Sequence, residues 1–349
     1  MLLYLHIPFC DSKCHYCSFN SYTDILDLTQ SYMIAMKKQL LFELERFDVK
    51  KNGIETIFIG GGTPSALPPK EYEEFFKILK PYLMPNIEIT TEANPNSASE
   101  DWLRGMRELG INRVSFGVQS FDDKKLKFLG REHSSLEAKI AIEKAHMIGI
   151  KNISCDLIYD TILDTKELLT SDLDIVFSLP INHLSSYSLT IEKGTNFFGK
   201  NNLLTKDENL ASWFIDEVKR RGFNQYEISN FGTYKSEHNL GYWTGKEYIG
   251  IGSGAVGFLR DKRFYTDKNV KSYIKNPTKI EIENLTQTEL KSEKIFLGLR
   301  SEIGVDITLL SDKKLQILKE TNKIKLIDTI AYNMDYLLSD EIALFLMED

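Results

Sequence analysis

An apolar run leads directly into three cysteines in the segment Leu2-Leu3-Tyr4-Leu5-His6-Ile7-Pro8-Phe9-Cys10-Asp11-Ser12-Lys13-Cys14-His15-Tyr16-Cys17. The run predicts a β-strand over residues 2–7, so the CxxxCxxC cluster lies in the loop that follows this strand. The fourth cysteine, Cys155, stands alone in an apolar stretch and is predicted to be a buried small hydrophobic residue. This distribution does not suit a disulfide framework and favours free thiolates in a reducing compartment.

Beyond this segment, short apolar runs alternate with amphipathic helical runs through the first two thirds of the chain, which is typical of parallel βαβ units. Strands are predicted at residues 2–7, 55–59, 87–91, 113–118, 152–159 and 183–189. Helices are predicted at residues 29–47, 69–83, 99–109 and 134–148. These units predict an α/β fold of the incomplete (β/α)6 barrel type. The loops that follow the strands should gather at one face, where barrel enzymes place their chemistry.

The pattern changes after about residue 205. A helix is predicted up to Arg221 and a strand near residues 222–229, before the glycine-rich run at residues 249–257. From Leu285 onward the chain is rich in Lys and Glu with helical spacing. We therefore predict three parts, which are a partial barrel (1–205), a β-containing extension (206–280) and a small, mostly helical C-terminal domain (281–349).

The composition and the first residues of the chain argue against a membrane anchor, a secretory signal and a nucleic-acid-binding surface. The 349 residues are 42% hydrophobic and 27% charged, and no apolar run approaches the roughly 20 residues that span a bilayer, so no intrinsic membrane anchor is expected. The first residues lack the basic region and cleavage site of a secretory signal, which predicts a cytoplasmic protein. The net charge of -7 argues against a nucleic-acid-binding surface.

The number of clustered cysteines points to a particular chemistry. A cubane iron–sulfur cluster usually has four cysteine ligands, so Cys10, Cys14 and Cys17 would leave one iron open to another ligand. Such an iron can hold S-adenosylmethionine (SAM) through its amino and carboxylate groups, and the cluster can reduce its sulfonium. The alternative is a structural zinc site that recruits His6 or His15 as the fourth ligand.

The segment from Tyr4 to Cys17 closely resembles the radical SAM family that contains HemN and HemW. The resemblance covers about residues 2–260 and implies a [4Fe-4S] cluster on Cys10, Cys14 and Cys17, with SAM at the remaining iron. Beside that reading, the spacing of the cysteines taken alone leaves the zinc alternative open.

The resemblance also implies a set of SAM contacts near the ends of the predicted strands. Gly60-Gly61-Gly62-Thr63-Pro64 is similar to the loop that contacts the SAM amino group, since glycines let the backbone approach a ligand. Glu92 matches an acidic contact, with an exposed surface carboxylate as the alternative. Gln119 matches a polar contact, Arg131 would pair with the methionyl carboxylate, and Asp156 with the ribose hydroxyls. The full implied set is Tyr4, Tyr16, Gly61, Gly62, Thr63, Glu92, Gln119, Arg131 and Asp156.

The family contains an oxygen-independent coproporphyrinogen III oxidase and a haem chaperone, and three features favour the chaperone. Phe19 stands where the oxidase has a fourth cysteine, only nine residues precede Cys10, and residues 237–243 contain the HNxxYW sequence associated with haem. A neutral imidazole is a good axial ligand for haem iron, so His238 is the candidate haem ligand. The alternative is that His238 and Asn239 cap a turn, while Tyr242 and Trp243 pack in the core.

The expected function is therefore binding of haem and its delivery to haem-requiring proteins such as membrane respiratory enzymes, with the cluster and SAM in a regulatory or assembly role. No catalytic residue is assigned. The first alternative is oxidative decarboxylation of coproporphyrinogen III, and the second is a radical SAM enzyme with another substrate. The chain departs from the family at Asp160-Thr-Ile-Leu-Asp-Thr165, where the usual Gly and Pro are missing, so the sequence does not fix the course of that loop.

Overall fold

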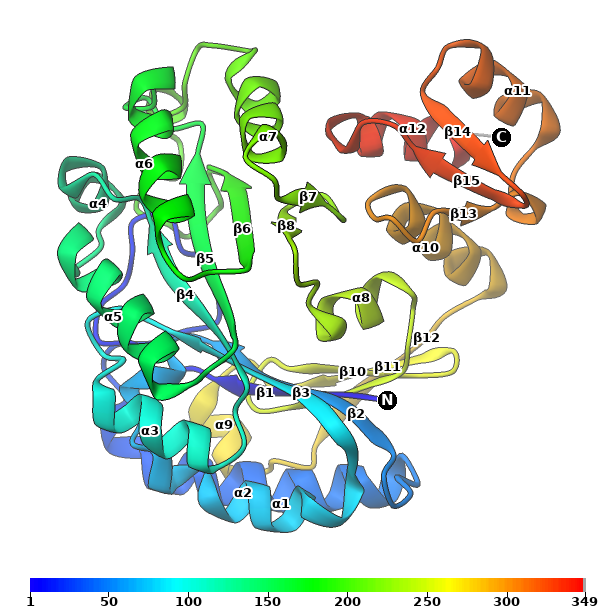
Figure 1. The fold of residues 1–349 in the computed structure, drawn as a ribbon. Coiled ribbons are helices and arrows are strands. Elements are labelled where there is room, and N and C mark those ends of the chain that lie inside the picture. The colour runs from blue at the N-terminus through cyan, green and yellow to red at the C-terminus, as the bar shows by residue number, and fades with distance from the viewer. Residues whose placement is uncertain (348–349) are drawn as a thin grey trace.

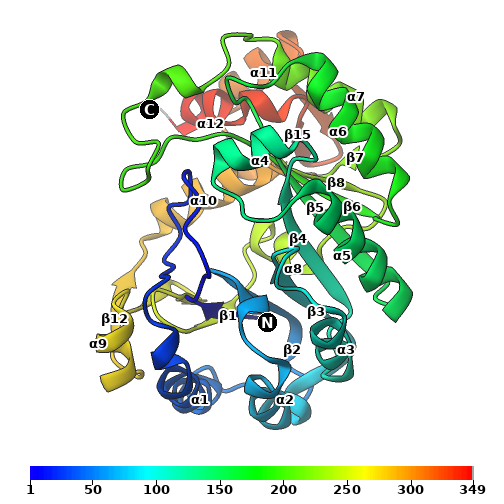
Figure 2. The ribbon, with the colours of Figure 1, turned by 90° about the vertical axis from the view of Figure 1, so that its left-hand side faces the viewer.

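The computed structural model describes residues 1–347, and most of the chain forms one curved sheet with helices on its outer side (Figure 1, Figure 2). The strands of this sheet are β1 (Leu2–Ile7), β2 (Ile54–Gly61), β3 (Leu83–Ala93), β4 (Arg113–Gln119), β5 (Asn152–Tyr159), β6 (His183–Ser188), β7 (Asn224–Gln225), β8 (Asn230–Gly232), β9 (Tyr248–Ile251), β10 (Val256–Leu259), β11 (Lys262–Thr266) and β12 (Ile280–Asn284). Their spatial order within residues 1–347 is β12-β11-β10-β9-β1-β2-β3-β4-β5-β6-β8-β7.

The outer layer consists of the helices α1 (Thr29–Arg46), α2 (Glu73–Leu79), α3 (Glu100–Glu108), α4 (Asp123–Leu129), α5 (Ser135–Ile148), α6 (Lys166–Ser178), α7 (Leu210–Arg220) and α9 (Val270–Lys275). Helix α8 (Glu237–Trp243) lies instead on the inner side of the curved sheet (Figure 1). Strands β1 to β6 pair in parallel and in sequence order, which confirms the predicted incomplete barrel. The sheet does not close, because β12 and β7 are its two edges.

The predicted elements of the barrel agree with the structure except at one helix. Strands β1 and β5 have the predicted bounds, and β3 is longer than predicted. The helix predicted at residues 69–83 is divided into the short helix α2 and 3-10 turns at Pro69–Glu71 and Lys80–Tyr82. Pro81 explains the end of α2, since proline lacks the N–H that a continuous helix needs. Cys155 is fully buried, as predicted.

The glycine-rich run brings the second half of the chain back beside the first strand. Strand β9 pairs in parallel with β1, and β10 turns back antiparallel to β9. A Cβ atom at Gly250 would lie 2.1 Å from the Val256 carbonyl oxygen, so only glycine permits this approach. The boundary at residue 205 between the first two predicted parts of the chain stays a prediction. Strands from both sides of it belong to the same sheet.

The C-terminal residues form a small unit with a core of its own. It contains α10 (Gln287–Leu299), α11 (Asp312–Glu320) and α12 (Ser339–Met347), with a sheet of β13 (Val305–Asp306), β14 (Ile324–Ile327) and β15 (Ile330–Asn333). Its buried apolar side chains cluster separately from the barrel core. Figure 1 shows the unit in orange and red, to one side of the large sheet. None of the helices within residues 1–347 combines the length and the apolar character that a membrane crossing requires.

An internal ion pair holds the loop that departs from the family. Asp160 adopts a left-handed conformation with φ of 66°, in the place of the missing glycine. The Lys125 ammonium lies 2.6 Å from the carboxylate of Asp164, and both side chains are fully buried. Lys125 also donates to the carbonyl oxygen of Ile158 at 2.6 Å. Lys125 therefore ties the loop to β5 through the ion pair with Asp164 and the hydrogen bond to Ile158, where the family usually has Gly and Pro in the loop.

Candidate functional site

A cavity of about 110 Å³ lies at the carboxyl ends of the first parallel strands. Most of the predicted cofactor residues line it, namely Cys10, Cys14, Tyr16, Cys17, Gly61, Gly62, Thr63, Glu92, Gln119, Arg131 and Asp156. Tyr4 does not, because its side chain lies on the wall of a second pocket. Asn94 and Ser115 also line the cavity and were not predicted. Asn94 follows Glu92 by two residues, so its position at the end of a strand was the available signal.

The three cysteines that face this cavity are free thiols. The Thr63 hydroxyl donates to Sγ of Cys10 at 3.4 Å, and Nη1 of Arg131 donates to Sγ of Cys14 at 3.3 Å. Burial raises the pKa of the Cys10 thiol, while hydrogen bonds from Thr63 and Ser21 lower it. The hydrogen bonds from Thr63 and Arg131 would stabilise Cys10 and Cys14 as thiolates, which is the form that binds iron.

The histidines of the zinc alternative are engaged elsewhere. His6 places Nδ1 3.0 Å from the Tyr4 hydroxyl and Nε2 2.9 Å from the Asn20 carbonyl oxygen. His15 places Nδ1 2.9 Å from the Phe128 carbonyl oxygen, and neither histidine lines the cavity. No group of three or more His, Cys, Asp or Glu side chains in residues 1–347 is arranged around a single-ion position. The donors that line the cavity are thus three sulfurs without a histidine, which is a donor set that suits an iron–sulfur cluster better than a zinc site of four ligands.

The glycine loop after β2 is bonded to the chain that precedes Cys10. The amide of Gly62 donates to the Ile7 carbonyl oxygen at 2.7 Å, and the amide of Thr63 donates to that of Phe9 at 2.7 Å. A Cβ atom at Gly62 would lie 2.6 Å from the Phe9 carbonyl oxygen and 3.0 Å from Sγ of Cys10. Gly62 is therefore required for the loop to approach the cysteines this closely.

Two carboxyl groups enclosed in the cavity make it favourable for a cationic ligand. Burial, together with the charge of Asp156, raises the pKa of Glu92 to about 7, although the amide of Gly61 donates to its carboxylate at 3.0 Å. Burial also raises the pKa of Asp156, which accepts a hydrogen bond from Ser115 at 3.0 Å. A positive ligand beside these groups would favour their ionised forms. Glu92 thus lies inside the cavity and not on the outer surface.

Gln119 and Arg131 also line the wall of the cavity. Gln119 has a φ of 73°, at the point where the register between β4 and β5 shifts. Such backbone strain is concentrated at functional sites. Nη2 of Arg131 donates to Asn94 Oδ1 at 2.7 Å and to the Gly117 carbonyl oxygen at 2.5 Å, whereas its buried Nε has no partner in the described residues. The guanidinium is therefore held at the cavity wall with donor capacity left over.

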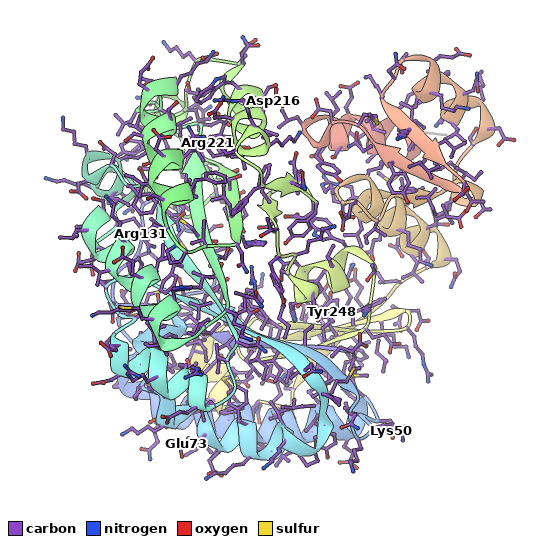
Figure 3. The ribbon with its side chains drawn as sticks, in the orientation of Figure 1. Lys50, Glu73, Arg131, Asp216, Arg221 and Tyr248 are labelled. Carbon is purple, nitrogen blue, oxygen red and sulfur yellow. The ribbon has the colours of Figure 1, made fainter. Side chains whose placement is uncertain are left out.

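A second pocket, of about 460 Å³, is lined mainly by aromatic side chains. Its lining residues are Tyr4, His6, Phe19, Asn20, Phe58, His238, Asn239, Tyr242, Tyr248, Gly254, Ala255 and Val256. Phe19 lines both the cavity and this pocket. Figure 3 labels Arg131, which belongs to the cavity, and Tyr248, which lies beneath α8 in the pocket.

His238 is buried at the wall of this pocket. Its Nδ1 lies 2.7 Å from the Thr56 hydroxyl, and its Nε2 is buried without a partner in the described residues. Burial, helped by the charge of Arg113, lowers the pKa of His238 to about 3, so the imidazole is neutral at physiological pH. The helix start is capped by Ser236 and not by His238, and Tyr242 and Trp243 are half-buried, so the alternative of a capped turn over core aromatics does not describe this region. Trp243 does not line the pocket.

Comparisons with known proteins identify relatives of this chain. Residues 4–166 match the model of the Radical SAM superfamily. The chain is 35% identical to the heme chaperone HemW of Lactococcus lactis, over 89% of this chain and 84% of that protein. It is 33% identical to the heme chaperone HemW of Bacillus subtilis, over 89% and 86%. The solved structure of the coproporphyrinogen III oxidase HemN of Escherichia coli has a TM-score of 0.83 at 20% identity, covering 99% of this chain and 89% of that one, and this likeness concerns the fold.

Proposed function

Because the chain belongs to the HemW family of radical SAM proteins, we propose that it binds haem and delivers it to haem-requiring proteins such as membrane respiratory enzymes. A [4Fe-4S] cluster and SAM occupy the cavity and have a regulatory or assembly role. The protein works in the cytoplasm, where free thiolates persist. The observation that carries the haem proposal is the buried Nε2 of His238, which has no partner among residues 1–347 and belongs to a residue that lines an aromatic pocket.

The second pocket suits a flat, apolar ligand that contains a metal. Phe58 and Tyr242 flank the His238 ring at centroid distances of 5.2 and 4.9 Å, and both line the pocket. Aromatic rings can cover an apolar macrocycle, and a neutral imidazole offers its lone pair to iron. Since Nε2 is covered by its surroundings, coordination requires the side chains over it to shift.

The cavity suits the cofactors of the radical SAM family. Cys10, Cys14 and Cys17 would hold the cluster, and Thr63 and Arg131 would donate hydrogen bonds to its sulfur ligands. When bound, a cluster with SAM supplies one-electron chemistry. The remaining side chains would bind and orient SAM: Glu92 and the glycine loop would hold its amino group, Arg131 its carboxylate and Asp156 its ribose. Tyr4 lines the second pocket instead, where its hydroxyl lies 3.0 Å from Nδ1 of His6.

The oxidase reaction is the competing proposal. The fold similarity to HemN is compatible with it, but Phe19 is 69% exposed at the position of the oxidase's fourth cysteine. Phe19 also lines the aromatic pocket, so the side chain at this position contributes surface to the haem site and not a sulfur ligand.

One experiment separates the two proposals. Anaerobically reconstituted protein is incubated either with haem or with coproporphyrinogen III, SAM and a reductant. Retention of haem through gel filtration, without formation of protoporphyrinogen, supports the chaperone. Turnover of coproporphyrinogen III would overturn it in favour of the oxidase.

A variant tests the haem ligand directly. His238→Ala should lose the shift of the haem Soret band while the absorbance of the cluster is kept, because the two sites use different ligands. His146→Ala, at an exposed position on α5, is the matched control and should bind haem normally. An unchanged Soret band in His238→Ala would reject His238 as the ligand.

A further inference from the structure

We infer that Thr56 and Glu88, on adjacent strands beneath α8, are the positioning residues of the haem ligand, holding the His238 ring and its helix in place. The inference rests on the proposed haem function. Thr56 lies on β2 and Glu88 on β3, and the two are register partners in the parallel ladder. Leu2 on β1 is the register partner of Thr56 on the other side, so three adjacent strands contribute one row of side chains. Figure 1 shows α8 lying over this part of the sheet.

Thr56 controls the ring of His238. Its hydroxyl lies 2.7 Å from Nδ1, and both side chains are buried. When Nδ1–H donates to the threonine oxygen, Nε2 carries the lone pair that an iron ligand needs. A hydrogen-bond acceptor on the second ring nitrogen also fixes the ring orientation and makes the ligand more basic.

Glu88 controls the helix that carries His238. Its carboxylate accepts hydrogen bonds from the amide of His238 at 3.0 Å and from the amide of Glu237 at 2.9 Å. It also accepts from the Tyr234 hydroxyl at 2.7 Å, which fixes the segment that leads into α8. The first amides of a helix have no partner within the helix, and a buried carboxylate at this end satisfies them. Glu88 is therefore attached to the backbone of the ligand residue itself.

Close packing of α8 on the sheet makes these contacts possible. A Cβ atom at Gly241 would lie 2.7 Å from a methyl carbon of Leu2, so a glycine at this position allows the helix to rest directly on β1. Leu2 therefore sets the distance between α8 and the sheet. Thr56 orients the His238 ring, and Glu88 holds the first turn of the helix. A shift of the helix would move His238 relative to the pocket.

The test compares haem binding by Thr56→Val, Glu88→Gln and their matched controls. Thr56→Val keeps the shape of the side chain but removes the partner of Nδ1, and Glu88→Gln keeps the volume but removes the charge and one acceptor oxygen. Loss of a partner of a metal-ligating histidine typically weakens metal affinity about 10- to 100-fold. We expect a weakening of haem affinity in this range for Thr56→Val, with a changed electron paramagnetic resonance spectrum of ferric haem. Glu88→Gln should show the same change of spectrum.

The controls change the same types of residue away from the His238 contacts. In the described residues the Thr244 hydroxyl bonds to the backbone of α8, and Thr244→Val removes it, while Glu73→Gln changes an exposed carboxylate at the start of α2. Both should bind haem normally, and Thr56→Ser should recover binding because it restores the hydroxyl. Circular dichroism and the cluster absorbance verify that each variant is folded.

The outcomes separate this inference from the function on which it rests. If His238→Ala abolishes the haem spectrum but Thr56→Val and Glu88→Gln leave it unchanged, the positioning role is wrong and the haem proposal stands. If His238→Ala leaves the haem spectrum unchanged, His238 is not the haem ligand, and the inference about Thr56 and Glu88 is overturned together with that assignment. A loss of haem binding in Thr56→Ser equal to that in Thr56→Val would also contradict the role of the hydroxyl.

Discussion

Nη1 of Arg131 lies 3.3 Å from Sγ of Cys14, although 117 residues separate them in the chain. The same guanidinium is anchored to Asn94 and to the Gly117 carbonyl oxygen. A residue assigned to SAM by resemblance is thus also a donor to a proposed cluster ligand. The two cofactors would share one cation, and its removal should affect both.

For Arg131→Met we expect a more negative reduction potential of the reconstituted cluster and weaker SAM binding. Hydrogen bonds to the sulfurs and nearby positive charge favour the reduced cluster, which carries one more negative charge. A redox titration followed by electron paramagnetic resonance measures the potential. Arg104→Met, which removes an exposed ion pair with Glu100, is the control and should have no effect. A potential equal to that of the unaltered protein would show that Arg131 does not act on the cluster.

Gly62→Ala should reduce the iron and sulfide content after reconstitution. The added methyl group would lie within 2.6 Å of the Phe9 carbonyl oxygen, so the loop must move away from Cys10. Gly257→Ala is the matched control, because its methyl group would meet only ordinary contacts, the nearest at 3.4 Å. Iron and sulfide analysis compares the two variants. Full cluster content in Gly62→Ala would contradict the need for this close approach.

Glu92→Gln should change the pH dependence of stability. The pKa of Glu92 is raised to about 7, so between its unfolded value of 4.5 and pH 7 the folded state holds a proton that the unfolded state has lost. Unfolding then releases a proton, and the free energy of unfolding decreases as the pH rises through this window. Relative to Glu92→Gln, the unaltered protein should lose stability from about pH 5 to pH 7 and change little above it. Urea unfolding of both proteins without SAM measures this, and a constant difference would refute it.

Lys125→Met should destabilise the fold strongly, because it leaves the Asp164 carboxylate buried without its cation. Removal of one member of a buried pair typically costs about 3–5 kcal/mol. Lys77→Met, which breaks the exposed pair with Glu74, should leave the stability nearly unchanged, because a solvent-exposed ion pair contributes little. Chemical denaturation gives both values. The double variant Lys125→Met/Asp164→Leu should recover much of the lost stability. If Lys125→Met and Lys77→Met lowered the free energy of unfolding equally, the role of the buried ion pair would be disproved.

Much of the fold could be predicted because its signals are local. The bounds of β1 and β5 follow from apolar runs a few residues long, and the order of strands and helices follows from their periodicity. The three cysteines that we propose as cluster ligands could be recognised for the same reason, since their spacing lies within one loop. The helix predicted at residues 69–83 was wrong in detail, because Pro81 interrupts it near its end.

The sequence by itself therefore determined the order of the βαβ units, the three clustered thiols and the set of candidate ligand residues. Only the tertiary structure decided that Tyr4 faces the aromatic pocket, that β9 pairs with β1, and that His238 meets Thr56 across 182 residues. It also placed Lys125 beside Asp164 in a loop whose course the sequence left open. The physical reason is that such contacts depend on which distant segments the folded sheet brings together, and the free energy that selects this arrangement is a property of the whole packed chain.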